Sequence, residues 1–252
     1  MREQIDTIPV NEAFETGDEC PFCYLERLCE QKAIRYTVGP GASYMEPDVR
    51  ETTDRRGFCR THMKKLYDYG NSLGNALILQ TYFVGLLKDL EQKAQDFVPE
   101  QKKSLFAPKK KAQPQENSLA LWAKERGSTC FICDKIEYNM RRYYKTFFYL
   151  LKEPAFREKV AASKGFCMHH FAQLLEYAPE ELPKGQQGWF YDTVFGLMRD
   201  NLARVQGDLD WFIQKFDYRN ASADWKNSKD AVSRAMQKLR GSYPADPPYK
   251  QD

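Results

Sequence analysis

Six of the seven cysteines in this chain belong to one pattern that occurs twice. In the first copy, a C-x-x-C motif at residues 20–23 is followed by G-F-C-R-T-H at residues 57–62. In the second copy, C-x-x-C at residues 130–133 is followed by G-F-C-M-H-H at residues 165–170. The interval between the two motifs is nearly the same in both copies. A spacing that is kept twice indicates an internal repeat, which constrains the fold more than local propensity does.

The residue types in this pattern are those that bind zinc in structural sites, where three thiolates and one imidazole commonly form a tetrahedron. C-x-x-C lets two sulfurs reach one ion from a single turn, and C-x-x-H places both residues on one helix face. We therefore predict two Zn²⁺ ions per chain, one in each copy. The expected ligands are Cys20, Cys23, Cys59 and His62 for one ion and Cys130, Cys133, Cys167 and His170 for the other.

The same cysteines are also compatible with iron–sulfur, redox and catalytic metal chemistry. Thiolates also ligate iron–sulfur clusters, and spacing alone does not separate the two, so a redox or oxygen-responsive iron–sulfur protein is the alternative. A thioredoxin-like redox pair is disfavoured because no βαβ context surrounds the C-x-x-C motifs. A catalytic metal would need an open position, whereas each copy supplies four ligands. The pattern therefore favours a protein that is not an enzyme.

Two residues near the motifs are assigned outside the ligand sets. Cys29 lies six residues after Cys23 and on a different face of the expected helix, so we expect a packed core thiol. His169 occupies the position that Thr61 holds in the first copy, and we expect it to be a partly exposed helix residue.

Helices are expected to position these motifs, because apolar residues recur at three- and four-residue steps. In the first copy the expected helices cover residues 21–36, 47–56, 59–69 and 73–97. In the second copy they cover residues 131–151, a short segment after Pro154, residues 167–177 and residues 187–216, and another short helix follows over residues 224–239. No segment shows the alternation of a strand.

The connections between these helices follow from composition. Pro179 and Pro183 are expected to mark a loop. Residues 1–18 are expected to be a lead-in that packs onto a larger body through Ile5, Ile8, Val10 and Phe14.

The predicted fold class is therefore all-α, with two pseudo-symmetric repeats of about four helices each, long packed helices and one metal site per repeat. The predicted domains are a first repeat over residues 1–98, a basic, proline-rich linker over 99–117, a second repeat over 118–218, and a C-terminal helix and tail over 219–252.

Composition and charge narrow the function classes. Apolar residues make up 42% of the chain and charged residues 29%, as in ordinary globular proteins. The net charge of +3 is too small to favour a nucleic-acid partner. No signal peptide or membrane-spanning stretch is recognisable, so we expect a cytoplasmic protein whose thiols stay reduced. A protein partner is the remaining expectation, and nothing in the sequence identifies it.

The chain resembles a family of uncharacterised bacterial cytosolic proteins. The resemblance rests on the I-P-V-N-E-A-F lead-in at residues 8–14, the C-P-[FL]-C helix start at residues 20–23, and the duplicated G-[FL]-C-x-x-H motif at residues 57–62 and 165–170. It covers most of the chain outside the linker and tail. The resemblance supports the domain architecture and brings no known activity. The expected function is that of a metal-binding helical protein with a structural or interaction role.

Overall fold

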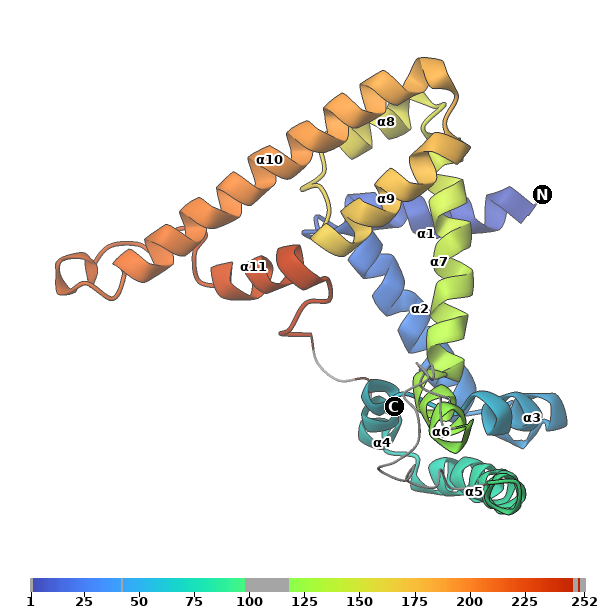
Figure 1. Cartoon of the computed structure of the whole chain (residues 1–252). Coiled ribbons are helices and arrows are strands. Elements are labelled where there is room, and N and C mark those ends of the chain that lie inside the picture. Colours follow the sequence, from blue (N-terminus) through green and yellow to red (C-terminus); the bar gives the residue numbers. More distant parts are fainter. Residues whose placement is uncertain (1, 42, 98–117, 247–248, 250–252) are drawn as a thin grey trace, which may run out of the picture. The chain divides into compact units, whose positions relative to one another are not determined.

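The computed structural model describes residues 2–41, 43–97, 118–246 and 249 (Figure 1). This part of the chain forms eleven α-helices and two short 3₁₀ helices and contains no strand, which confirms the all-α class. The α-helices are α1 (Arg2–Glu15), α2 (Pro21–Val38), α3 (Pro47–Arg56), α4 (Arg60–Tyr69), α5 (Ser72–Gln95), α6 (Ser118–Ser128), α7 (Phe131–Leu150), α8 (Pro154–Ala161), α9 (Met168–Glu181), α10 (Lys184–Gln214) and α11 (Ala231–Arg240). The 3₁₀ helices are η1 (Ser43–Met45) and η2 (Tyr218–Asn220). None of the helices in the described residues has the length and apolar character that crossing a membrane requires.

The chain divides into two compact units, and each draws on both sequence repeats. Unit 1 comprises Met1–Glu30 and Ile136–Pro247, and unit 2 comprises Gln31–Lys135 and Pro248–Asp252. Unit 1 thus contains the first C-x-x-C motif and the second G-F-C-x-x-H motif, and unit 2 contains the other two. These bounds differ from those of the two predicted repeats. The linker expected over residues 99–117 lies outside the described residues.

Unit 1 is built around a cluster of buried aromatic rings. At its centre, Phe147 of α7 is fully buried. The rings around it come from α1, α2, α7, α8, α10 and the turn before α9, with centroids 5.2–6.4 Å away: Phe14, Phe22, Phe148, Phe156, Phe166 and Phe190. Burial of each ring contributes about 1.5–3 kcal/mol. The aromatic residues of α7 thus pack against five other elements.

The N-terminal segment forms a full helix, α1, where a lead-in was expected. Val10 and Phe14, one turn apart, are buried against the aromatic cluster. Ile5 and Ile8 lie on another face of α1 and are exposed, so the expectation that they pack was wrong. The buried face of α1 also carries Asp6, whose carboxylate accepts two hydrogen bonds from Arg142 of α7.

Helix ends differ from expectation where side chains or prolines act locally. Helix α9 continues through Pro179 to Glu181, because a proline so close to the end removes only one helical hydrogen bond. The Ala178 carbonyl still accepts from the Leu182 N–H. The last helix begins at Ala231 and not near residue 224, where the Asp224 carboxylate accepts from the Lys226 N–H and forms a turn instead.

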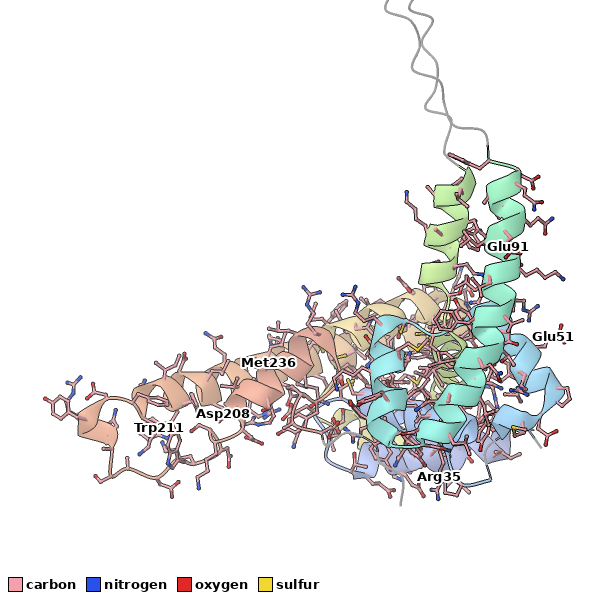
Figure 2. All side chains as sticks on the ribbon, turned by 90° about the horizontal axis from the view of Figure 1, so that it is seen from below. Arg35, Glu51, Glu91, Asp208, Trp211 and Met236 are labelled. Atoms are coloured by element: carbon pink, nitrogen blue, oxygen red, sulfur yellow. The ribbon has the colours of Figure 1, made fainter. Side chains whose placement is uncertain are left out.

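Unit 2 contains α3 to α6 and the ends of α2 and α7. Helix α3 packs against α5. Helix α6, which the sequence pattern did not reveal, lies alongside α5, and Glu91 marks the distal part of α5 in Figure 2. Arg126 of α6 binds Asp89 at 2.5 Å and lies over the ring of Tyr82. Arg56 of α3 forms a bidentate ion pair with Asp134 of α7, in which its Nε and Nη2 atoms lie 2.5 and 2.7 Å from the two carboxylate oxygens.

The aromatic cluster leads to a stability prediction. Replacing Phe147 by alanine should lower the free energy of unfolding by about 3–5 kcal/mol, because a large cavity opens among rings that cannot collapse into it. The matched control is Phe83→Ala on the exposed face of α5, where Phe83 is 56% exposed. That variant should change stability by about 0.5 kcal/mol or less in chemical denaturation. Equal losses in the two variants would contradict the assignment of the core.

Candidate metal centres

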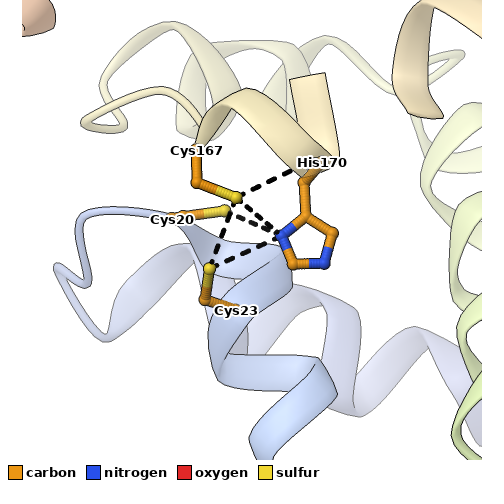
Figure 3. Close-up of side chains that lie close together, drawn as sticks. All are labelled: Cys20, Cys23, Cys167 and His170. Atoms are coloured by element: carbon orange, nitrogen blue, oxygen red, sulfur yellow. Dashed lines mark hydrogen bonds between the residues drawn. The ribbon is translucent and has the colours of Figure 1, made fainter. Parts of the chain in front are cut away.

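The first group of metal-ligating residues brings three thiols and one imidazole together in unit 1 (Figure 3). Its members, which we call site 1, are Cys20, Cys23, Cys167 and His170. The Nδ1 atom of His170 lies 3.4, 3.5 and 3.1 Å from the sulfurs of Cys20, Cys23 and Cys167. The sulfurs of Cys23 and Cys167 are 3.6 Å apart. All four side chains are buried, none being more than 5% exposed.

The second group lies in unit 2 and has the same composition. Its members, which we call site 2, are Cys59, His62, Cys130 and Cys133. The Nδ1 atom of His62 lies 3.2, 3.3 and 3.3 Å from the sulfurs of Cys59, Cys130 and Cys133. The sulfurs of Cys59 and Cys133 are 3.9 Å apart. The ligand atoms of site 2, like those of site 1, all lie within 4.8 Å of one another.

All eight residues singled out from the sequence therefore lie in the two groups, but their division between the groups was wrong. We expected Cys20 and Cys23 to join Cys59 and His62, within one repeat. They join Cys167 instead, together with His170, while the first G-F-C-x-x-H motif joins the second C-x-x-C motif. A backbone hydrogen bond from the Phe131 N–H to the Gly57 carbonyl, 2.9 Å, accompanies this exchange and joins the start of α7 to the first G-F-C turn.

The glycine of each G-F-C motif is required by the turn that leads into the ligand pair. Gly57 has φ +57° and Gly165 has φ +73°, in the left-handed region that side chains with a Cβ rarely adopt. Space is also short at Gly57, where a Cβ would lie only 3.0 Å from the Tyr82 ring, whereas a Cβ at Gly165 would be in ordinary contact, 3.4 Å, with the Leu197 carbonyl oxygen. These turns set the direction in which α4 and α9 begin.

Each site lies at the N-terminal ends of two helices. Cys59 and Cys167 are the N-cap residues of α4 and α9, and the C-x-x-C motifs open α2 and α7. In site 1 the Cys167 sulfur also accepts a hydrogen bond from the His170 N–H at 3.4 Å. The positive ends of the helix dipoles therefore point at the sulfurs and favour thiolates there.

The thiols of site 1 differ in their proton affinity. Burial raises the pKa of Cys20 well above its usual value, and a hydrogen bond with Cys167 raises the pKa of Cys23. Hydrogen bonds from Cys20 and Cys23 lower the pKa of Cys167 strongly, and His170 adds to this effect. One thiolate held by two thiols is thus the favoured state of the bare protein. Binding a divalent ion would displace the remaining thiol protons.

Site 2 shows the same division. Burial acts to raise the pKa of Cys130, but hydrogen bonding to His62 and to backbone amides outweighs it and lowers the value to about 6. Burial and the neighbouring Cys130 raise the pKa of Cys133. Arg56 lies close enough to Cys130 to interact with its charge. In each site one cysteine thus has a lowered pKa beside another whose pKa is raised, and a bound cation would favour ionisation of the latter.

The imidazole of His170 has a carboxylate near its outer nitrogen. Its Nε2 atom lies 3.7 Å from the Glu26 carboxylate, while its Nδ1 atom faces the three sulfurs, an arrangement in which the carboxylate helps to orient the ring. Glu26 also groups with the exposed His169 around His170. His169 lies outside the Cys3His group of site 1, as expected. Cys29 is a buried core residue outside both sites, also as expected.

A functional contact that sequence reasoning missed is the cover over site 1. Gly241, directly after α11, has φ +75°, and a Cβ there would lie 3.5 Å from the Cys167 sulfur and 3.7 Å from that of Cys23. The backbone N–H of Ser242 hydrogen-bonds to Cys23. The C-terminal segment, expected to be only a helix and a tail, thus closes one side of the site. In the sequence, this contact is indicated only by Gly241, which directly follows the basic last turn of α11.

Helix α11 is held over site 1 by its polar face. Arg234, Gln237 and Lys238 are buried, whereas Val232, Met236 and Leu239 on the other face are exposed (Figure 2 labels Met236). Lys238 donates to the carbonyls of Glu19 and Lys164 at 2.5 Å. Arg234 binds the Asp208 carboxylate of α10 at 2.8 Å.

The buried partner of these cations is Glu19, which directly precedes the ligand Cys20. Its carboxylate lies 2.5 Å from Arg204 and 3.3 Å from Lys238. Burial lowers the pKa of Lys238, while Glu19 and Cys20 act in the opposite direction. Cationic side chains therefore lie beside the sulfur-rich site and offset its negative charge.

The grouping predicts how pairs of ligand substitutions combine. Cys20→Ser with Cys167→Ser removes two ligands from site 1 only, so the variant should keep one tightly bound zinc ion per chain. Cys20→Ser with Cys59→Ser removes one ligand from each site and should keep none, because two thiolates and an imidazole bind far more weakly than the full set. Elemental analysis after dialysis gives the count, with Cys59→Ser/Cys130→Ser as the matched site 2 variant. The reverse pattern would restore the grouping within each repeat.

Comparison with known proteins identifies a family for this chain but no individual relative. No curated protein and no solved structure matches the chain. Residues 1–246, which include both sites and the α11 cover, match a family of unknown function, DUF6062. The chain therefore belongs to the DUF6062 family.

Proposed function

We propose that this protein is a zinc protein without enzymatic activity, in which two structural ions hold the helices together. The observation that carries the proposal is the close convergence of three sulfurs and one imidazole nitrogen in each site. Each ion would bind the C-x-x-C motif of one repeat and the C-x-x-H motif of the other. The two repeats would then be linked twice, at two separate points of the chain.

The distances between the ligand atoms support a single ion in each site. Zinc binds thiolate sulfur at about 2.3 Å and imidazole nitrogen at about 2.0–2.1 Å, so a tetrahedron has edges of about 3.8 Å between sulfurs and about 3.6 Å between sulfur and nitrogen. The observed sulfur pairs are 3.6 and 3.9 Å apart. The sulfur–nitrogen distances run from 3.1 to 3.5 Å. Only small shifts would complete the tetrahedron.

The same distances argue against the iron–sulfur alternative. The ligands of a cluster bind different iron atoms, so their donor atoms must lie farther apart than the edge of one tetrahedron. The donor atoms of each site lie within 4.8 Å of one another. A cluster would require the helix ends to move apart, whereas a single ion fits the helices where they are.

The closed ligand set supports a structural role. Catalytic zinc keeps a position open for water or substrate, while four protein ligands fill the shell of a structural ion. A zinc ion with three thiolates leaves each site with a net charge of −1, which the helix N-termini and nearby cations offset. A protein with two structural ions would act by presenting a stable surface to another protein, so an adaptor role is part of the same proposal.

The state of the cysteines supports a cytoplasmic location. All seven are free thiols, and two of the sulfurs in site 1 are only 3.6 Å apart. The more accessible pair, Cys59 and Cys133, lies 3.9 Å apart, and a reducing cytoplasm would keep such thiols available as ligands.

The direct test is elemental analysis of the purified full chain, which should give two zinc ions per chain and no stoichiometric iron. Removing them with a strong chelator under reducing conditions should lower the Tm by about 10 °C or more, because each lost kcal/mol costs about 2–4 °C at this size. Adding zinc back should restore the Tm. Brown protein with stoichiometric iron and sulfide, or a Tm insensitive to chelation, would overturn the proposal.

A further inference from the structure

The two sites have the same ligands but differ in their access to solvent. In site 1 the four side chains are buried, with Cys20 and Cys167 fully enclosed. In site 2, His62 and Cys130 are buried, but Cys133 is exposed and Cys59 is half-buried. The difference therefore lies in the sulfurs on one side of site 2, and not in the ligand set.

The cause is visible in what lies over each site. Site 1 is covered by the turn at Gly241, which α11 brings against the sulfurs of Cys23 and Cys167. Helix α11 packs against both α9 and α10 (Figure 1), so this cover is anchored on two sides. In site 2, by contrast, Cys133 lies in the first turn of α7 and is exposed to solvent in the part of the chain that the structure describes.

The two accessible sulfurs of site 2 are also neighbours. Cys59 and Cys133 lie 3.9 Å apart, so a disulfide, with sulfurs about 2.05 Å apart, needs only a short approach. The sulfurs of Cys23 and Cys167 in site 1 are even closer, at 3.6 Å, but both residues are buried, at 3% and 0% exposed. Access and not separation therefore distinguishes the two sites. Reaction of a thiolate with an oxidant requires such access.

We propose, building on the zinc-binding function above, that site 2 is an oxidant-sensitive site. A hydroperoxide converts Cys59 and Cys133 to a disulfide there and releases the zinc ion, while site 1 keeps its ion. Site 1 then preserves the fold of unit 1, and the loss of the other ion frees the starts of α4 and α7 in unit 2.

The reaction balances with hydrogen peroxide as the oxidant. The Cys133 thiolate attacks one oxygen, the O–O bond breaks, and a sulfenic acid forms while the leaving hydroxide takes a proton from solvent. The Cys59 thiolate then attacks this sulfur, the S–S bond forms, and the S–O bond breaks to give a second water with another solvent proton. Two electrons pass from the sulfurs to the peroxide. Zinc leaves because only Cys130 and His62 remain to bind it.

The test treats the zinc-loaded full chain with hydrogen peroxide in the presence of a chromogenic zinc indicator. One of the two ions should appear in solution, at least about tenfold faster than the second, because only one site exposes its thiolates. Peptide mass analysis should find the disulfide between Cys59 and Cys133, and a dithiol reductant with zinc should restore the loaded state.

Two matched variants separate access from affinity. Cys133→His keeps four ligands in site 2 but removes the exposed thiolate, so the fast release should disappear. Cys23→His makes the same exchange in the buried site and should leave the fast release unchanged. If Cys133→His loads only one ion, alkylation of the wild-type holoprotein replaces it, and Cys133 should react at least about tenfold faster than Cys23.

The outcomes separate the two proposals. A chain that takes up no zinc fails at the loading step, which overturns the zinc function and this inference together. A chain that loads two ions but releases them at equal rates, or loses the site 1 ion first, overturns the oxidant-sensitive site alone. A disulfide between Cys23 and Cys167 would also overturn it.

Discussion

Three thiols and one imidazole, held within a few ångströms of one another in each site, are the constraint on which the rest of the structure depends. In site 1 the pKa of Cys167 is lowered and that of Cys20 is raised, so without a cation one thiolate is favoured beside a protonated neighbour. A divalent ion would allow all three sulfurs to ionise and would replace their weak mutual hydrogen bonds by four bonds to metal. The starts of four helices meet at these two points, so the sites fix how the helices are arranged.

Because each site combines residues of both sequence repeats, it links parts of the chain that lie far apart in the sequence. Each site joins residues more than 65 positions apart, for example His62 and Cys130 in site 2. In unit 1 the aromatic core supports the same pairing, because the ring of Phe22, which lies within the C-x-x-C motif, stacks on Tyr144 and lies 5.8 Å from the His170 ring. Packing and ligation therefore favour one arrangement, a consistency typical of sequences that specify a single fold.

The sequence was sufficient for the parts of the structure that depend on local pattern. The periodicity of apolar residues located α2, α5 and α7 closely, and the repeated motifs contain all eight residues of the two Cys3His groups. The pairing of the motifs could not be predicted, because both copies have the same spacing and either C-x-x-C motif could satisfy either C-x-x-H motif. Only long-range contacts, such as the bond from Phe131 to Gly57, decide between them.

The role of the C-terminal segment was missed for a different reason. Helix α11 buries its charged face against Glu19 and Asp208 and exposes Val232 and Met236, the reverse of the amphipathic rule for surface helices. Gly241 touches site 1 through its backbone, so no ligand-type side chain marks it in the sequence. The cover gives the two sites different surroundings, although their ligands are the same.

X-ray absorption at the zinc edge of the purified full chain tests the central claim most directly, since it reports the atoms bound to the ion. The structure predicts an average shell of three sulfurs at about 2.3 Å and one nitrogen at about 2.0–2.1 Å. A shell made mainly of oxygen or nitrogen would contradict the account, because it would show that the converging sulfurs of the two sites do not hold the ion.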